Sequence, residues 1–129
     1  MTKEELKYRT KAFAVSVIKY MDTLPKNKAN DVITYQIIKS ATSVGANYRS
    51  ACRGRSTAEF ISKLNIVIEE ADETCYWLEI IGEVNETVDK NILKILHQES
   101  NELTAIFTAA SKTIKANTAN QKLEIKNQR

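Results

Sequence analysis

Hydrophobic residues recur along this chain with the spacing of amphipathic helices. At a helical advance of about 100° per residue, each of four stretches gathers its large apolar side chains on one face. Pro25, Gly54 and the segment from Gly82 to Asn85 separate the stretches, because proline cannot continue a helix and glycine favours its end. The pattern predicts helices near residues 3–23, 28–54, 56–83 and 89–117.

Each predicted helix offers one apolar stripe to a shared core. The stripes are Leu6, Phe13, Val17, Tyr20 and Leu24; Ile33, Ile37, Ser40, Val44, Tyr48 and Ala51; Phe60, Leu64, Ile68, Ala71, Cys75 and Leu78; and Ile92, Leu96, Leu103, Phe107, Ala110 and Ile114. Short links make consecutive helices antiparallel neighbours. We therefore expect an all-α protein, an antiparallel up-down-up-down four-helix bundle over residues 1–118, followed by a flexible tail over 119–129.

Helix-capping residues support two of these boundaries. Ser56 followed by Glu59 has the spacing of a capping box, in which the side chains of both residues satisfy backbone N–H groups at a helix start. Asp89 stands where the fourth helix is expected to begin, and aspartate is a preferred N-cap residue. Both features predict helix starts.

The composition is consistent with a helical fold and argues against all-β, disulfide-rich and membrane-spanning proteins. Three glycines and one proline in 129 residues are too few for the turns of an all-β fold. Two cysteines cannot build a disulfide framework, and the opening MTKEELKYRT lacks the apolar segment of a signal peptide. No apolar run approaches the roughly 20 residues of a membrane span. We expect a cytoplasmic protein with reduced thiols and no membrane partner.

The helix expected over residues 56–83 carries a second apolar line opposite its core stripe. Its members have coiled-coil spacing and are Ile66, Glu73, Trp77 and Ile80. The first helix repeats the pattern more weakly with Tyr8, Val15 and Ile18. Either neighbouring helices or the tail cover this face, or another copy of the chain does. We favour a homo-oligomer interface.

Charge is distributed unevenly, although the net formal charge is only +3. Residues 1–55 carry a balance of +7, residues 56–104 of −8 and residues 105–129 of +4. Within the basic part, one helix face gathers Lys39, Arg49 and Arg53, and Arg55 follows at the helix end. Guanidinium groups pair with phosphates and stack on bases, which suits RNA. The alternatives are a solvated face, or a face that docks on the acidic helix of another copy. Lys3, Lys7, Lys11 and Lys19 could extend the basic surface.

Residues that could support catalysis or bind a metal are sparse. Cys52 and Cys75 lie on or near the core stripes, and no second histidine or cysteine stands at metal-ligand spacing. His97 has no nucleophile beside it, and the acidic residues between Glu69 and Glu79 point away from the core without a Glu-x-x-His pair. The sequence also has no phosphate loop or dinucleotide fingerprint. We predict no enzyme, no cofactor and no metal. Glu99 lies near the fourth stripe without a partner that the sequence identifies.

Three segments resemble a known family. They are residues 41–56 (ATSVGANYRSACRGRS), 58–64 (AEFISKL) and 69–79 (EEADETCYWLE). They are similar to the four-helix-bundle proteins encoded in intervening sequences of bacterial 23S rRNA genes. The resemblance implies a left-handed antiparallel bundle that assembles into a ring-shaped homopentamer, with no established catalytic activity. A similar bundle is the accessory protein of diversity-generating retroelements, which binds nucleic acid and a reverse transcriptase.

Residues and resemblance together predict a non-enzymatic, ring-forming bundle that binds structured RNA through basic surfaces. The resemblance makes ribosomal RNA the expected ligand. The alternative is a protein-interaction scaffold or adaptor, for example for a reverse transcriptase, that does not bind RNA itself. RNA retention at physiological salt distinguishes the two hypotheses.

Overall fold

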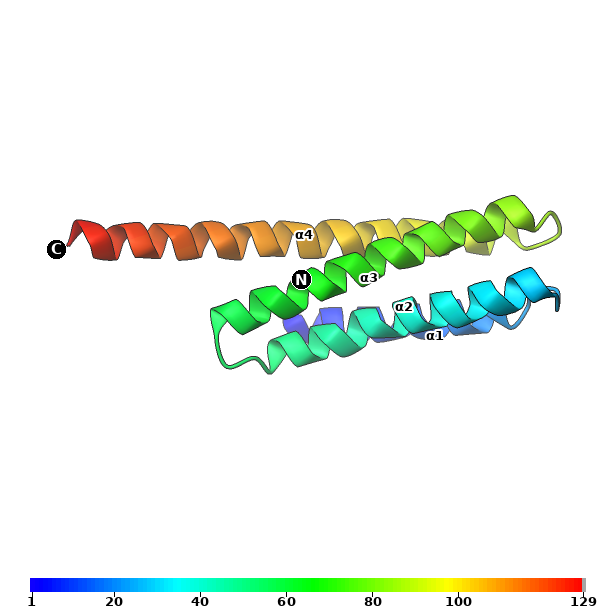
Figure 1. The fold of residues 1–129 in the computed structure, drawn as a ribbon, viewed down its shortest axis with the longest axis horizontal. Helices are drawn as coiled ribbons and strands as arrows, with labels where there is room; N and C mark the ends of the chain where they lie inside the picture. The colour runs from blue at the N-terminus through cyan, green and yellow to red at the C-terminus, as the bar shows by residue number, and fades with distance from the viewer. Residues whose placement is uncertain (129) are drawn as a thin grey trace.

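The fold is all-α, as expected. The structure, a computed structural model, describes residues 1–128, and these residues contain four helices and no strand. The helices are α1 (Lys3–Met21), α2 (Lys28–Cys52), α3 (Thr57–Val84) and α4 (Lys90–Asn127) (Figure 1). The first three lie within one or two residues of the boundaries that the sequence predicts. Within residues 1–128, no helix combines the length and the hydropathy that crossing a bilayer requires.

Side chains cap the start of every helix. Thr2, Asn27 and Ser56 each accept a hydrogen bond from the backbone N–H three residues later. Asp89 Oδ1 accepts two, from Asn91 and Ile92, at 3.0 Å each, which confirms the predicted cap. Ser56 and Glu59 form the expected pairing except in one detail. The Glu59 carboxylate accepts from the N–H of Arg55, one residue before the position that a capping box uses.

The predicted stripes pack into one core, with a correction in α4. Ile92 is 44% exposed, and Leu93 packs against the core in its place. The true stripe continues through the buried residues Leu96, Ser100, Leu103, Phe107 and Ser111. Its three- and four-residue steps are those of a heptad seam. Ser100 and Ser111 belong to this stripe but are polar, so the pattern of apolar positions does not include them.

Paired contacts show how neighbouring helices lie. Asn30 bonds to Asn85 and Ser40 to Thr74, so α2 and α3 run in opposite directions. A Cβ atom on Gly45 would lie 3.1 Å from Thr10 Oγ1, so glycine lets α2 approach α1 closely. The packing of α1 against α4 is the least extensive of the four neighbouring pairs.

The last helix is longer than the sequence predicts. It continues to Asn127, ten residues beyond the expected end, and extends past the α2–α3 loop (Figure 1). Residues 119–128 are exposed. The segment contains no glycine or proline to stop the helix and several good helix formers. The flexibility expected for the tail over 119–129 stays a prediction.

Candidate functional site

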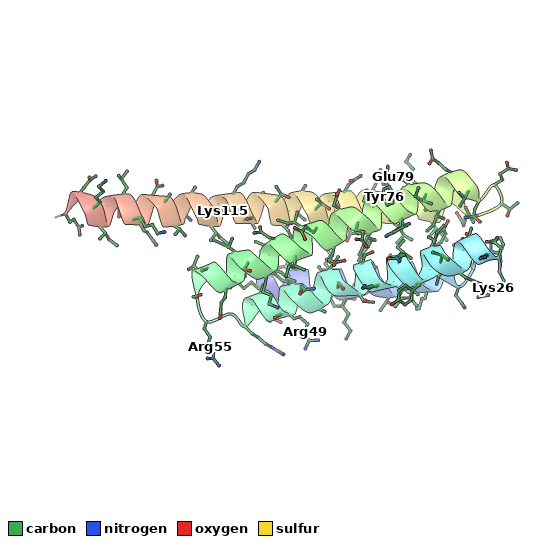
Figure 2. The ribbon with its side chains drawn as sticks, in the orientation of Figure 1. Lys26, Arg49, Arg55, Tyr76, Glu79 and Lys115 are labelled. Carbon is green, nitrogen blue, oxygen red and sulfur yellow. The ribbon has the colours of Figure 1, made fainter. Side chains whose placement is uncertain are left out.

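A basic groove lies between α1 and α2. It brings together residues that the sequence analysis placed on two separate helices: Glu4, Lys7, Tyr8, Lys11, Arg49 and Arg53. Lys7 and Lys11 stand one helical turn apart on α1, and Arg49 and Arg53 stand one turn apart across the end of α2. Figure 2 shows Arg49 reaching outward from α2. The two Arg candidates therefore share one surface, and α1 extends it.

Positive charge in this groove is only partly neutralised. Glu4 is the one carboxylate that lines it within residues 1–128. Glu4 pairs with Lys7 at 3.0 Å in a largely exposed ion pair, which holds the two groups weakly. The C-terminal end of α2 favours a cation at Arg49 through its dipole. The remaining cations face solvent near one another, an arrangement that an anion stabilises.

The other two basic candidates lie apart from this groove. Arg55 lines the next hollow, at the α2–α3 loop, together with Lys3. Lys3 Nζ lies 5.2 Å from the centre of the Phe60 ring, so it is held there by a cation–π contact. Lys39 lies near Glu70. Burial and repulsion from Glu73 raise the pKa of Glu70, and Lys39 opposes both. Lys39 therefore acts electrostatically on an acidic group of its own chain.

Tyr8 connects two surface hollows. Its side chain is 77% exposed, and it lines both the basic groove and a hollow between α1 and α4. The sequence analysis assigned Tyr8 to an oligomer interface. Its position also suits an aromatic ring that stacks on an unpaired base.

The second line of α3 is more covered than expected. Trp77 and Ile80 are half-buried and pack against the core, and Ile66 is half-buried. Glu73 is exposed and accepts a hydrogen bond from Trp77 Nε1 at 3.3 Å. Contacts within the bundle therefore shield part of the indole, so neighbouring helices cover this face in part.

Exposed apolar side chains gather instead on α1 and at the start of α4. Val15 and Ile18 are 41% and 39% exposed on the outer face of α1. Ile95, which is exposed, lines the hollow between α1 and α4 with Tyr8. Of the apolar residues that the sequence predicts in the oligomer interface, Tyr8, Val15 and Ile18 on α1 are more exposed than Ile66, Trp77 and Ile80 on α3.

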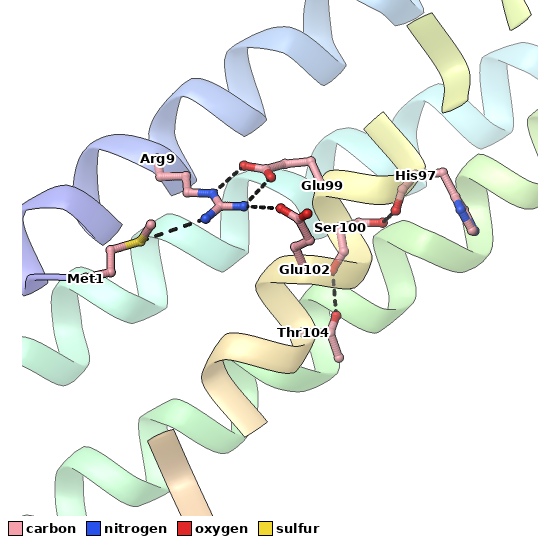
Figure 3. A network of polar contacts seen from close by, with 7 residues as sticks. All are labelled: Met1, Arg9, His97, Glu99, Ser100, Glu102 and Thr104. Atoms are coloured by element: carbon pink, nitrogen blue, oxygen red, sulfur yellow. Dashed lines mark hydrogen bonds and ion pairs between the residues drawn. The ribbon is translucent and has the colours of Figure 1, made fainter. Parts of the chain in front are cut away.

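Arg9 provides the main polar link between α1 and α4 (Figure 3). Its Nε and Nη2 atoms donate to the two Glu99 oxygens at 2.7 and 2.6 Å, and Nη2 also donates to Glu102 at 2.6 Å. Hydrogen bonding to Glu99, opposed by burial, raises the pKa of Arg9 above its ordinary value. Glu99 thus has the partner that the sequence could not identify.

A cluster of four polar side chains spans α3 and α4, and the sequence analysis missed it. Glu79 Oε2 lies 3.4 Å from Cys75 Sγ and 3.2 Å from His97 Nε2. Asn101 approaches both Cys75 Sγ, at 3.3 Å, and His97 Nδ1, at 3.5 Å. The only signal in the sequence was a four-residue spacing on each helix, between Cys75 and Glu79 and between His97 and Asn101.

Titration behaviour in this cluster follows from its surroundings. Burial raises the pKa of the Cys75 thiol, so the thiol is protonated at neutral pH. The hydrogen bond with His97, followed by the one with Cys75, lowers the pKa of Glu79. Glu79 is therefore a carboxylate, and the cluster holds one negative charge next to a histidine.

Comparison with known proteins shows similarity to one family and to solved structures. The sequence profile of the 23S rRNA-intervening sequence protein family matches residues 4–109. The crystal structure of a protein of unknown function from the S23 ribosomal protein family of Bacteroides thetaiotaomicron is similar to this chain. The two are 33% identical, with a TM-score of 0.78, over 87% of this chain and 99% of the other. No curated protein matches the sequence at a significant level.

Proposed function

This chain belongs to the 23S rRNA-intervening sequence protein family, and on that basis we propose that it binds structured RNA. Ribosomal RNA is the leading candidate for this ligand. The binding surface is the groove lined by Lys7, Lys11, Arg49 and Arg53. Arg55 and Lys3 extend this surface at the α2–α3 loop. The protein acts by binding in the cytoplasm, and catalysis is not part of the role.

The convergence of cations in one groove is the observation that carries this proposal. Four cationic side chains and a single carboxylate line the groove. Bringing like charges together on a surface costs free energy, and phosphates offset that cost while releasing counterions. Tyr8 stands at the edge of the groove with an exposed ring, where base stacking adds roughly 1–3 kcal/mol per base. The groove thus offers contacts both to backbone and to an unpaired nucleotide.

Assembly belongs to the same proposal. The bundle has alternating helix directions and a left-handed twist, and it forms a ring-shaped homopentamer through the outer faces of α1 and α3. The exposed side chains of Val15 and Ile18 support a contact on α1. A ring repeats one groove per subunit, so several weak contacts to one RNA act together.

The test is RNA binding by two charge-matched double variants. Arg49→Ala/Arg53→Ala removes two cations from the groove, and Lys26→Ala/Lys28→Ala removes two exposed cations at the α1–α2 loop and the start of α2. Binding to a 23S rRNA fragment is measured by fluorescence anisotropy at several salt concentrations. We expect the groove variant to lose about tenfold or more in affinity and to lower the salt slope by about two. The control retains wild-type affinity within a few fold.

Equal effects of the two variants would contradict the assignment of the groove. A wild-type protein that retains no RNA at physiological salt would contradict the proposed function itself. That result would favour the second candidate, an adaptor that binds a protein such as a reverse transcriptase. The hollow between α1 and α4, with the exposed side chains of Tyr8 and Ile95, is the feature that supports the adaptor role.

A further inference from the structure

We propose that Cys75, Glu79 and His97 form a binding site for a zinc ion between α3 and α4. Their thiol, carboxylate and imidazole ligand atoms all lie within 4.8 Å of one another. Thiolate, imidazole and carboxylate are the ligand types that Zn²⁺ takes in proteins. The site does not depend on RNA binding, and it lies on a different pair of helices from the basic groove.

Two of the three distances between these ligand atoms are close to those around a tetrahedral ion. Zinc bonds of about 2.0–2.3 Å at a tetrahedral angle put neighbouring ligand atoms roughly 3.4–3.6 Å apart. Cys75 Sγ lies 3.4 Å from Glu79 Oε2, and Glu79 Oε2 lies 3.2 Å from His97 Nε2. The Cys75 sulfur and the imidazole nitrogen lie within 4.8 Å of each other, so side-chain rotation has to bring these two closer for all three groups to bind one ion.

The hydrogen bonds of the cluster do not satisfy every electron-rich atom in it, so a cation can bind there. Cys75 has one thiol hydrogen, but two oxygens approach its sulfur, Glu79 Oε2 at 3.4 Å and Asn101 Oδ1 at 3.3 Å. The thiol can donate to only one of them at a time. A positive ion beside the sulfur and Glu79 Oε2 would satisfy the sulfur as a thiolate and the carboxylate together.

Asn101 is placed to position the histidine. Asn101 Nδ2 lies 3.5 Å from His97 Nδ1. With Nε2 on the ion, Nδ1 carries the ring hydrogen, and rotation of the Asn101 amide turns its oxygen to accept from Nδ1. Metal-binding histidines usually have such a partner on the other ring nitrogen. Asn101 is therefore a positioning residue and contributes no ligand atom in this proposal.

Burial divides the site into a closed side and an open side. Cys75 is buried, whereas Glu79 is exposed and His97 is half-buried. Glu79 and His97 also line a surface groove with Gly82, Glu83 and Lys94. An ion can enter from this groove, and water from it completes the fourth position.

The charge balance of binding is simple. Zn²⁺ replaces the proton of the Cys75 thiol, and this proton is released to solvent. His97 binds the ion through Nε2 of its neutral ring. The thiolate and the Glu79 carboxylate then neutralise the two charges of the ion. No oxidant or other reactant is required.

Cobalt(II) titration of the full chain tests the proposal. The protein is stripped with a chelator, kept reduced with a phosphine and titrated with Co²⁺, and Zn²⁺ is then added. We expect one Co²⁺ per chain with the strong visible bands of tetrahedral cobalt and a sulfur-to-cobalt charge-transfer band, both removed by Zn²⁺. Cys75→Ser should abolish the charge-transfer band, and His97→Ala should weaken binding by about tenfold or more.

Cys52→Ser is the matched control, because Cys52 is the other cysteine of the chain and lies on α2. It should leave the spectrum unchanged. Wild-type protein without tetrahedral bands, or bands that persist in Cys75→Ser, would overturn the proposal. Circular dichroism shows whether each variant folds. If Cys75→Ser does not fold, unchanged cobalt affinity in His97→Ala would overturn the proposal by itself.

Discussion

The side-chain amides of Asn30 and Asn85 form two reciprocal hydrogen bonds. Asn30 Nδ2 donates to Asn85 Oδ1 at 2.9 Å, and Asn85 Nδ2 donates to Asn30 Oδ1 at 3.0 Å. Both residues are buried. Asn30 also donates to the Pro25 carbonyl and Asn85 to the Ile81 carbonyl. The pair thus joins the start of α2, the end of α3 and the α1–α2 loop.

Breaking this amide pair should destabilise the protein. Asn85→Ala leaves a buried Asn30 amide without its partner, so we expect the free energy of unfolding to fall by about 1–3 kcal/mol. Urea denaturation followed by circular dichroism measures the change. Asn120→Ala, at an exposed position of α4, should change it by less than about 0.5 kcal/mol. Equal stability of the two variants would show that the pair contributes nothing.

Loss of Arg9 should lower the free energy of unfolding more than loss of either carboxylate that it binds. Arg9→Met removes all three hydrogen bonds to Glu99 and Glu102 and leaves the partly buried Glu99 without its cation. We expect a loss of about 1–2 kcal/mol in urea denaturation. Glu102→Gln, at a largely exposed carboxylate, should cost no more than about 1 kcal/mol. A larger loss in Glu102→Gln than in Arg9→Met would contradict this order.

Glu79 should titrate differently without His97. Hydrogen bonding to His97 is the main cause that lowers the pKa of Glu79, so in metal-free His97→Ala this pKa should rise toward its ordinary value of about 4.5. The carboxyl carbon of Glu79, followed by NMR during an acid titration, reports the change. Gln98→Ala, the neighbouring exposed position, should leave the titration of Glu79 unchanged.

The same shift has a consequence for stability. Because the pKa of Glu79 is lower in the folded protein than in the unfolded chain, its contribution is present at pH values above about 4.5. That contribution is lost as the pH falls through the folded-state pKa. The urea midpoint of the wild type should therefore fall more between pH 6 and pH 3 than that of His97→Ala. An identical fall in both would contradict the coupling.

The oligomer interface should respond to charge on the outer face of α1. Val15→Glu/Ile18→Glu puts two carboxylates where the proposed ring contact excludes water, so the ring should dissociate. Protomer stability should change little, because both side chains are partly exposed already. Light scattering after gel filtration measures the mass. Trp77→Glu is a poorer test, since Trp77 also packs against the core.

Val32→Glu/Ile125→Glu is the matched control for this experiment. Both side chains are more than half exposed, on α2 and near the end of α4, so this variant should keep the oligomer. A wild-type protein that is monomeric at all concentrations would contradict the ring, and dissociation of both variants would contradict its placement on α1.

Hydrophobic spacing and helix-capping residues in the sequence determined most of this fold. A helix closes its hydrogen bonds within a few residues, and its buried face repeats every 3.6 positions. The stripe from Ile33 to Ala51 is therefore visible in one dimension, and so are the caps at Ser56 and Asp89. The positive charge of α1 and α2 also follows directly from the Lys and Arg content of these segments.

Only the tertiary structure decided which separate segments meet. It placed Arg9 beside Glu99, ninety residues later, and it packed Trp77 partly against the core of its own bundle. It also brought Cys75 and Glu79 of α3 to His97 of α4. Such contacts depend on the rotation and register of one helix against another. These are set by side-chain packing across the whole core, and no local pattern contains them.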